Sequence, residues 1–588
     1  MNLTFFRLSA IVILLTLAKP SQGSWFTAKK SGFFSDTATW YGNVVPPTVL
    51  GSNSIRIPSG INVSLDVDII LNNQYSEIEF FHTGGSPGKI ISTTNNHISI
   101  HDGNIRGLGT IDIDSMYVGI PSFRMSGTLN LNKLALSGTE MIPDYSIQTN
   151  IRKELRLAGG TSKFIYSSVT VALDTNADLV YGGGILATIP NSLDVSKGYN
   201  LRYTSISYVH HTFKNVNTLN EFEVAVGAGN TLRLTADVFV PKKLLLTSGS
   251  LKTDGYTLTF GPDSGIEPGG NGNITGTNAT RIVVQSTLPH FGVIRFSGNI
   301  GNFEIQSNTN VELGTDLFIS NSMSLQSGRL ILNDNNVSLA QAAGITGGSD
   351  VSYIITNGKG QLKQHIPAGG NKVYPVGSMQ HFAPVTLGNN AVSNYPDIGV
   401  NVSDTVFSHG TTGFDLVNTF AIINSAWTVS GNLSNVDLSI EPVWSGANEK
   451  NGFNANSCFV SHYTNGGWDV LPGTAATITG AQKSIRRSPV QNFGVFTVAD
   501  NNTRLSVHDN TSGREEITVY PNPATDNIRI TCNGDGIKNA SIYDMSGRAV
   551  KTFQLGRGTT NIDISTLSNG IYQVSCNGYT NGFRFVKN

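Results

Sequence analysis

Two aspartates in this sequence are spaced so that they could act together in catalysis. Asp112 and Asp114 stand in the stretch GTIDIDSM and alternate with Ile111 and Ile113. In a β-strand, residues two apart share a face and lie about 6.6 Å apart, a separation at which paired carboxylates can cleave a glycosidic bond. The same alternation is typical of a half-buried strand whose aspartates face water. We expect the solvated strand and keep Asp112 and Asp114 as the catalytic candidates of an alternative hypothesis.

Other residue types that could carry chemistry do not form a recognisable centre. His210 and His211 are adjacent, so in a strand they would point to opposite faces and could not readily share a metal ion. The sequence has no His-Glu-x-x-His motif and no Cys-x-x-Cys pair. We therefore expect no metal and no cofactor, and a protein that is not an enzyme.

Three tryptophans, Trp427, Trp444 and Trp468, occur within residues 361–501 among strand-like stretches such as VDLSIEPVW. We expect residues 361–501 to form a β-sandwich domain whose tryptophans fill the core, because burial is the commoner fate of large aromatic side chains. Alternatively, the rings could form a flat platform for a sugar, which would make the chain a carbohydrate-binding protein.

The composition indicates which elements must carry these residues. Only 13% of the 588 residues are charged and the formal net charge is −1, which disfavours nucleic acid as a partner. Glycine is abundant, with 64 residues, and short apolar stretches lie between glycines and asparagines. Because Gly and Asn accept the positive φ of tight turns, this pattern predicts many short strands and an all-β fold.

A self-comparison of the sequence reveals an internal repeat. Residues 232–260 align without a gap to residues 311–339, at an offset of 79 (311 − 232 = 79). Asp237 matches Asp316, Phe239 matches Phe318, and apolar residues alternate in both copies. Such alternation indicates strands with one buried face.

Two architectures fit these repeated strands. A parallel β-helix would stack them into one continuous core, whereas a string of antiparallel sandwiches would use Asp254-Gly255 as a hairpin turn. We expect a parallel β-helix-like solenoid over residues 24–360, with on the order of a dozen turns.

The segments that flank this solenoid resemble parts of known secreted proteins. Trp40, Pro46-Pro47 and the alternating stretch SIRIPSGINVSL resemble the opening of many secreted bacterial β-solenoid proteins. An aromatic entry segment there would cover the open end of the first turn. After the repeats, Tyr374-Pro375-Val376-Gly377 resembles a segment that often follows such repeats in exported proteins of the Bacteroidetes.

The first residues have the pattern of an export signal. Arg7 is followed by an apolar run from Leu8 to Ala18 and by small residues up to Gly23, so we expect residues 1–23 to be a signal peptide. No later stretch approaches the ~20 apolar residues that a membrane-spanning helix needs. We therefore expect a mature, exported chain with no transmembrane segment.

Three cysteines are too few for a disulfide framework, but two of them could form one bridge. In NIRITC and IYQVSC the alternation places Cys532 and Cys576 on the apolar faces of their strands. We hypothesise a Cys532–Cys576 disulfide, with two buried thiols as the alternative.

Residues 515–588 contain short alternating strands bounded by Gly, Asn, Asp and Ser, as a small immunoglobulin-like β-sandwich requires. They follow residues 502–514, a polar stretch without strand periodicity that we interpret as a linker. The segment closely resembles the C-terminal sorting domain, type A, of the bacterial type IX secretion system. The matching residues are Tyr520, Pro521, Asn522, Pro523, Tyr543, Asp544, Gly547, Arg548, Gly570, Tyr572 and Lys587.

The resemblance implies a delivery route, partners and a location. Such domains are recognised by the type IX outer-membrane machinery, and their proteins are commonly cleaved near the linker and then joined to surface lipopolysaccharide or released. This places the protein on the cell surface or outside a Bacteroidetes-type bacterium. On physical grounds, Pro521 and Pro523 lack backbone N–H groups, so we expect them to keep the domain's first edge from pairing with upstream strands.

These features favour a non-catalytic role. A long surface of uncharged hydroxyl and amide side chains suits weak, multivalent contacts better than a preorganised reaction site. We expect an adhesin-like protein that contacts glycans or an extracellular matrix. The alternatives are a polysaccharide-active enzyme that uses Asp112 and Asp114, a carbohydrate-binding protein, and a purely structural stalk.

Overall fold

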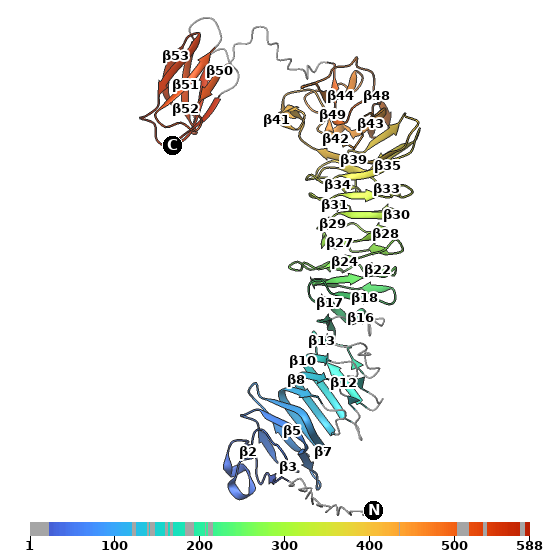
Figure 1. Ribbon diagram of the computed structural model, residues 1–588, viewed down its shortest axis with the longest axis vertical. Coiled ribbons are helices and arrows are strands. Elements are labelled where there is room, and N and C mark those ends of the chain that lie inside the picture. Colours follow the sequence, from blue (N-terminus) through green and yellow to red (C-terminus); the bar gives the residue numbers. More distant parts are fainter. Residues whose placement is uncertain are drawn as a thin grey trace, which may run out of the picture. The chain divides into compact units, whose positions relative to one another are not determined.

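The computed structural model describes residues 23–119, 125–137, 140–141, 147–158, 163–164, 169–182, 193–205, 207–209, 216–433, 435–501, 517–532, 538–576 and 583–588. The expected signal peptide lies outside these ranges except for Gly23, and the expected linker lies wholly outside them. The described residues form strands β1 to β56 and five short 3-10 helices, with no α-helix among them (Figure 1). The predicted all-β fold is confirmed. The 3-10 helices are η1 (Thr37–Thr39), η2 (Tyr41–Asn43), η3 (Val216–Thr218), η4 (Leu416–Asn418) and η5 (Gly446–Asn448).

The chain divides into two compact units, Met1–Thr503 and Arg504–Asn588. The first unit contains a β-solenoid of about 13 turns over residues 54–377. Neighbouring strands of successive turns run parallel, so the predicted solenoid is confirmed. Strand pairing joins Asp112 to Asn130 (130 − 112 = 18) and Glu223 to Leu245 (245 − 223 = 22), so these turns are 18 and 22 residues long.

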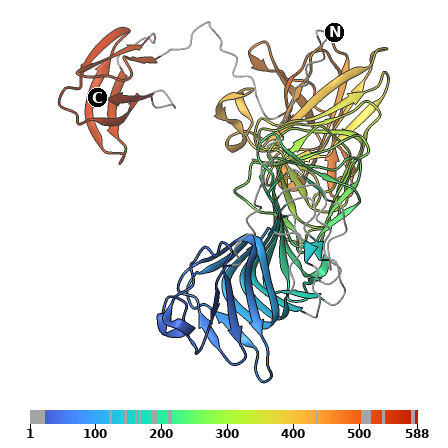
Figure 2. The ribbon, with the colours of Figure 1, turned by 60° about the horizontal axis from the view of Figure 1, so that its bottom comes forward.

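The first turns form one large sheet of long strands (Figure 2). In spatial order it contains β1 (Trp25–Thr27), β3 (Ser54–Pro58), β5 (Ile69–Phe81), β7 (His97–Val118), β8 (Ser126–Ser137), β10 (Ile147–Ala158), β13 (Ala177–Tyr181), β15 (Tyr199–Tyr203), β17 (Leu219–Ala225), β20 (Lys243–Ser248) and β23 (Gly265–Ile266). Strands beside this path are β2 (Gly32–Phe33), β4 (Asn62–Ser64), β6 (Gly88–Ile91), β12 (Val169–Leu173) and β14 (Leu193–Asp194), while β9 (Glu140–Met141) pairs with β11 (Lys163–Phe164).

Glycines allow these long strands to turn corners without leaving the sheet. Strand β7 is 22 residues long and contains Gly103 and Gly107, whose φ values are +116° and +91°. A Cβ at Gly107 would stand 2.1 Å from the backbone oxygen of Phe80 on the preceding turn. Both the positive φ and the close approach therefore require glycine at position 107.

The later turns break into separate sheets, one for each flank of the solenoid (Figure 1). One flank contains β16 (Ser207–Val209), β18 (Thr231–Leu234), β21 (Ser250–Lys252), β24 (Asn273–Thr275) and β27 (Phe296–Ser297). A second contains β19 (Val238–Val240), β22 (Thr257–Phe260), β25 (Arg281–Val284), β28 (Asn299–Ile305), β30 (Leu317–Leu325), β32 (Val337–Leu339) and β33 (Gly344–Gly347). A third contains β26 (His290–Ile294), β29 (Asn310–Leu313), β31 (Arg329–Ile331), β34 (Ile354–Ile355) and β37 (Val376–Gly377).

Apolar side chains stack from turn to turn to make the solenoid core. Leu232 pairs with Leu251, Leu251 with Ile274, and Ile274 with Phe296. All four are at most 4% exposed. Burial of one such side chain favours folding by about 1.5–3 kcal/mol, and every turn contributes several. A turn cannot bury its inner face alone, so each turn is stable only on its neighbours.

Asp254 and Gly255 form a corner of the solenoid rather than a hairpin turn. Their φ values are +50° and +93°, as a tight turn requires. The strands on either side, β21 and β22, lie in different sheets and each pairs in parallel with the next turn. The tandem-sandwich alternative for this region is therefore wrong.

The internal repeat reproduces the corners of the solenoid. Asp237 and Asp316 each accept a backbone hydrogen bond from a residue 20 positions later: Asp237 from the N–H of Thr257 at 2.8 Å, and Asp316 from the N–H of Asn336 at 2.7 Å. Each carboxylate thus fixes the start of a strand on the following turn.

The repeat is nevertheless out of phase with the turns. Phe239 lies on β19 and Phe318 on β30, within the same sheet. Following the strand pairing from Phe239 leads in order to Thr259, Val283, Glu304 and Ser324. The two repeated phenylalanines therefore occupy different positions around the solenoid.

An aromatic segment closes the start of the solenoid core, as predicted. Trp40 is fully buried, and its indole N–H donates to the backbone oxygen of Phe34 at 2.8 Å. The two rings pack edge to face at 5.3 Å between centroids. Ala28 and Leu50 are also fully buried in this cluster, so the first turn does not expose its inner face.

Parallel stacking gives way to antiparallel sheets near residue 362. Strand β35 (Leu362–Ile366) pairs in parallel with β32 and antiparallel with β39 (Tyr395–Ser403). The sheet that contains β35 and β39 then continues through β42 (Ala426–Ser430), β49 (Gly494–Asp500), β44 (Cys458–Thr464) and β45 (Gly467–Trp468). A second contains β36 (Asn371–Tyr374), β38 (Val385–Asn389), β43 (Leu438–Ser445), β46 (Thr477–Thr479), β47 (Gln482–Ser484) and β48 (Arg487–Val490), and a hairpin joins β40 (Phe407–His409) to β41 (Thr412–Asp415).

The second unit contains two small antiparallel sheets around a core of its own. One sheet has the order β50 (Ile517–Tyr520), β51 (Asn527–Cys532), β54 (Gly558–Asp563). The other has the order β53 (Ala549–Leu555), β52 (Lys538–Asp544), β55 (Gly570–Cys576), β56 (Phe583–Lys587). Side chains from both sheets, among them Ile530, Ile542 and Phe585, share this buried core.

Candidate functional site

The two candidate catalytic aspartates lie on the outer face of β7 and are already bound to neighbouring turns. Asp112 accepts from Arg152 Nη2 at 2.9 Å in an ion pair. Asp114 accepts from Asn132 Nδ2 at 2.8 Å, on the next turn. Ile111 and Ile113 between them are buried, as the alternation predicted. Within the described part of the chain, the two carboxylates therefore belong to polar ladders that tie adjacent turns together.

The tryptophans of the region after the solenoid are buried. Trp427, Trp444 and Trp468 are at most 2% exposed. The Trp427 indole N–H donates to the Ala383 backbone oxygen at 2.8 Å, and that of Trp444 to Glu449 Oε1 at 3.0 Å. The alternative of a sugar platform made by these rings is wrong, because no ring face is open to a ligand.

The side chains of four other residues that the sequence analysis considered are not described. His210 and His211 lie outside the described residues. The backbones of Cys532 and Cys576 end strands of different sheets, β51 and β55, but their side chains are not among those described. The disulfide between them stays a prediction.

The described residues contain no group of three or more His, Cys, Asp and Glu side chains that could hold a metal ion. The helices in the same part of the chain include none long and apolar enough to cross a membrane.

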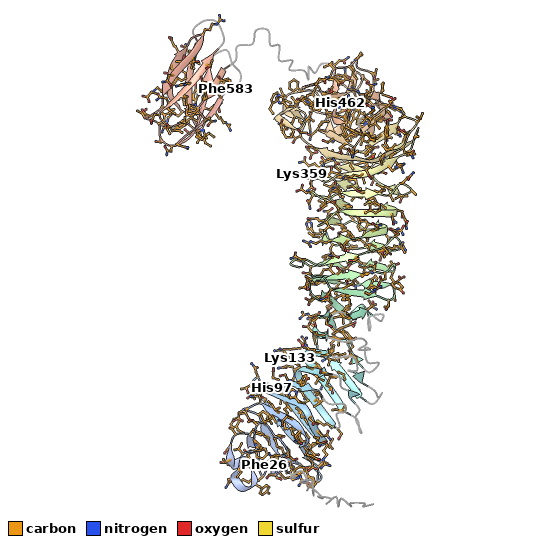
Figure 3. All side chains as sticks on the ribbon, viewed as in Figure 1. Phe26, His97, Lys133, Lys359, His462 and Phe583 are labelled. Carbon is orange, nitrogen blue, oxygen red and sulfur yellow. The ribbon has the colours of Figure 1, made fainter. Side chains whose placement is uncertain are left out.

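The first turns carry an exposed aromatic cluster that the sequence analysis did not single out. The Arg56 guanidinium lies 4.5 Å from the ring centroid of Trp25 and 5.0 Å from that of Phe81. Both rings are 44% exposed. Arg56 Nε also binds Glu79 Oε2 at 2.6 Å. Figure 3 labels Phe26, the neighbour of Trp25, at this end of the solenoid.

In the C-terminal unit, the Tyr-Pro-Asn-Pro segment is fastened to the last strand. Val586 N–H donates to Asn522 Oδ1 at 2.9 Å, and Asn522 Nδ2 donates to the Arg584 backbone oxygen at 3.2 Å. Ala524 is the first residue after Pro523 and has a backbone N–H, which donates to the Val586 backbone oxygen at 2.8 Å. One asparagine side chain thus replaces the backbone pairing that the flanking prolines cannot make.

This geometry corrects the expected role of the two prolines. Pro521 and Pro523 follow β50 rather than lie within it, and Tyr520 still pairs with Arg529 on β51. The prolines therefore do not protect the free edge of β50. They carry the chain across to β56 of the second sheet, where Ala524 pairs with Lys587.

A second part of the signature forms the turn between β52 and β53. Asp544 Oδ1 accepts from Ser546 Oγ at 2.5 Å and from the backbone N–H of Arg548 at 3.1 Å. These hydrogen bonds hold the pKa of the Asp544 carboxyl below its usual value, and the bond from the Ser546 side chain has the largest effect. Gly547 has a φ of +81°, which a residue with a side chain rarely adopts. Asp544 and Gly547 together therefore define the turn, and Arg548 Nε closes it on Asp544 Oδ2 at 3.2 Å.

The signature residues converge although they are far apart in the sequence. Asp544 pairs with Tyr572, and Tyr572 pairs with Phe585, on which its ring stacks at 5.7 Å between centroids. Gly570 pairs with Lys587, which in turn pairs with Ala524 after the proline segment. Tyr543, next to Asp544 on β52, is half-buried. One end of the second sheet therefore collects the motifs, with Tyr520 exposed nearby at 43%. Figure 3 labels Phe583, the first residue of β56.

Comparison with protein families gives this unit an identity. Residues 518–584 match the family model described as the secretion system C-terminal sorting domain. The match implies secretion by the type IX system of the Bacteroidetes, contact with its machinery, and attachment at the outer-membrane surface or release. No curated protein and no solved structure matches the chain.

Proposed function

We propose that this protein is displayed on the cell surface or released, and that its body makes non-catalytic contacts with glycans or an extracellular matrix. In this proposal residues 1–23 are an export signal and residues 24–360 and 361–501 are the displayed body. Residues 502–514 are the linker near which the chain is cut, and residues 515–588 are the sorting domain. Surface lipopolysaccharide is the acceptor when the body stays attached.

One observation carries the proposal: the outward polar groups of the solenoid are bound to one another from turn to turn. Asn150 Nδ2 donates to Asn130 Oδ1 at 2.8 Å, and Asn130 and Asp112 are paired in turn on the neighbouring strand. Asp112 also forms an ion pair with Arg152. A general acid or base needs a carboxyl free to exchange a proton with its substrate, whereas ladders of amides and paired charges give a flank suited to repeated weak contacts.

Binding and turnover can be measured together to test this role. The full chain, applied to a glycan array and to polysaccharides with a reducing-end assay, is expected to bind without releasing new ends. Asp112→Asn and Asp114→Asn should leave binding unchanged. Cleavage of any polysaccharide that Asp112→Asn abolishes would contradict the proposal and favour a polysaccharide-active enzyme.

Delivery is tested separately, in the native host. Removal of residues 515–588 is expected to leave the body in the periplasm, whereas the full chain reaches the cell surface or the medium. Blotting of surface, medium and periplasmic fractions measures this. A lipopolysaccharide-sized shift of the surface form would support attachment, and a discrete soluble form would support release. Unchanged delivery of the shortened chain would contradict the assignment.

A further inference from the structure

The outer face of the first turns combines open aromatic rings with hydrogen-bonding charges. Strand pairing aligns Thr27, Arg56, Glu79 and Arg106 across β1, β3, β5 and β7. The buried side chains of Ile55, Ile57, Ile78 and Phe80 alternate with them, so the aligned residues point outward. Trp25 lies two residues before Thr27 and Phe81 two residues after Glu79, on the same face. The exposed rings and the charges therefore form a single surface, which we call the first-turn platform.

The platform is held in one arrangement before any ligand arrives. Arg56 lies against both rings, at 4.5 Å from the Trp25 centroid and 5.0 Å from the Phe81 centroid. In each contact the positive guanidinium is attracted to the negative face of the ring. The bond from Arg56 Nε to Glu79 fixes the guanidinium. Rings that are already oriented lose little conformational freedom on binding.

The charges of the platform balance one another. Arg106 Nη2 binds Glu79 at 3.0 Å, and Arg106 Nε binds Glu77. Two arginines thus face two glutamates, and burial raises the pKa of the Glu77 carboxyl, with Arg106 acting in the opposite direction. An anionic ligand would gain no net attraction here. The Arg106 side chain is 51% exposed, so its guanidinium still offers donors to a neutral ligand.

We propose that the first-turn platform of Trp25, Arg56 and Phe81 binds an uncharged glycan chain, with a pyranose ring stacked on Trp25 and hydroxyl groups bonded to the neighbouring guanidinium and carboxylate groups. The inference deepens the proposed function and rests on it, since it gives the glycan contact a place and a ligand class.

The chemistry favours a sugar over a protein partner. A pyranose has an apolar C–H face for an aromatic ring and hydroxyls at its rim, which can both donate to carboxylates and accept from guanidinium groups. The platform offers the same combination, with rings flanked by donors and acceptors in close contact. A hot spot for a protein is usually ringed by groups that exclude water, whereas here the rings and charges stand on an open sheet face.

Tryptophan fluorescence can report on this surface alone. The chain has five tryptophans, and Trp25 is 44% exposed while the other four are at most 2% exposed. The full chain is titrated with cellohexaose, xylohexaose and mannohexaose, with polygalacturonate and heparin as anionic comparisons. We expect a blue shift and protection from acrylamide quenching with at least one neutral oligosaccharide. This fluorescence signal can be measured on the wild-type protein, without any substitution.

Variants then assign the signal. Trp25→Ala should weaken binding by about tenfold, the upper value for a stacked aromatic contact, and Arg56→Lys by about threefold. Because Trp25→Ala removes the reporting ring, the affinities of all variants are measured by isothermal titration calorimetry. Tyr41→Ala is the matched control, because Tyr41 is 65% exposed in the same end segment but has no part in the platform. Circular dichroism and the melting temperature verify that each variant folds.

Each outcome separates this inference from the proposed function. Glycan binding with unchanged Trp25 fluorescence, or binding that Trp25→Ala retains, overturns the platform and leaves the surface role intact. Preference for polygalacturonate or heparin overturns the neutral ligand class. Binding only to collagen- or fibronectin-coated surfaces overturns the glycan site but keeps a matrix contact. No binding to any of these probes overturns both.

Discussion

The solenoid and the C-terminal unit use strands in opposite ways. In the solenoid, each strand pairs with a strand about one turn away, so Leu251 touches Leu232 and Ile274. The C-terminal unit combines local hairpins, such as β50 with β51, with distant contacts: Asn527 pairs with Asp563, and Asn522 binds Val586 across 64 residues. Local pairing distributes stability along the stack, whereas distant pairing makes the unit depend on all of its strands at once. The displayed body should therefore tolerate local damage, while the sorting domain should fail as a whole.

The largest effect should come from truncating a buried isoleucine to alanine in the core of each region. Ile542→Ala and Ile282→Ala each remove a fully buried isoleucine and should cost about 2–5 kcal/mol. We expect Ile542→Ala to raise hydrogen exchange throughout residues 517–588 and to reduce surface delivery. Ile282→Ala should raise exchange only in its own and adjacent turns and leave delivery unchanged. Exchange mass spectrometry measures both, and equally local changes would refute the contrast.

Glycine substitutions sharpen the comparison at the corners. Gly328 in the solenoid and Gly547 in the C-terminal unit have φ of +78° and +81°, so alanine meets similar backbone strain at either. A Cβ at Gly328 would stand 2.4 Å from the Ser307 backbone oxygen. A Cβ at Gly547 would have no neighbouring heavy atom within 4 Å. Gly547→Ala should cost about 1 kcal/mol and Gly328→Ala about 1–3 kcal/mol more.

Melting of the two parts, followed by differential scanning calorimetry, measures these costs. Gly229→Ala is the control within the solenoid, since its φ is +79° and its Cβ would meet nothing within 4 Å. If Gly229→Ala and Gly328→Ala cost the same, close packing between turns is not what restricts the corners.

Asn522→Ala tests how the C-terminal unit holds its last strand. The substitution removes the two hydrogen bonds to β56, of 2.9 and 3.2 Å, and should cost about 1–2 kcal/mol. Exchange of residues 583–588 should rise first. Asn588→Ala, which keeps the backbone bond of residue 588 to Ala524, serves as the control. Unchanged exchange in Asn522→Ala would show that the proline segment does not fasten β56.

The smallest effect concerns acid stability of the solenoid ladders. Arg281 donates to both oxygens of Glu304 at 2.7 and 3.0 Å, and these hydrogen bonds lower the pKa of that carboxyl from its usual value. The stabilisation is present above the unfolded pKa and is lost as the pH falls through the lower, folded pKa. Glu304→Gln should therefore cost less than about 1 kcal/mol at pH 7, and the difference from wild type should shrink as the pH falls through the folded pKa. Urea unfolding of both proteins over a series of pH values from 7 downward measures it.

The sequence predicted the features that depend on neighbouring residues. Alternation around Asp112 identified the strand and its outer face, and the type IX resemblance predicted the sorting domain that the family model matches over residues 518–584. It did not predict that Asp112 binds Arg152 or that Arg56 lies between Trp25 and Phe81. Those contacts depend on the register between turns whose lengths vary, and no single-residue pattern records that register.

The two repeated segments also show how far pattern and geometry can diverge. The matched aspartates, Asp237 and Asp316, predicted a common local structure, and both bind a backbone N–H at a corner. Their offset suggested stacked copies, yet Phe239 and Phe318 are not on one line of pairing. Neither residue type nor spacing specifies how many turns an offset spans.

That mismatch limits how such a protein can be lengthened. A copy inserted or lost at the offset of 79 (311 − 232 = 79) would not add or remove whole turns. Every later strand would then be rotated about the long axis, and the antiparallel cap beyond residue 362 would meet the wrong flank. Growth by duplication is therefore compatible with this fold only when added or lost residues restore the rotation of the strands that follow.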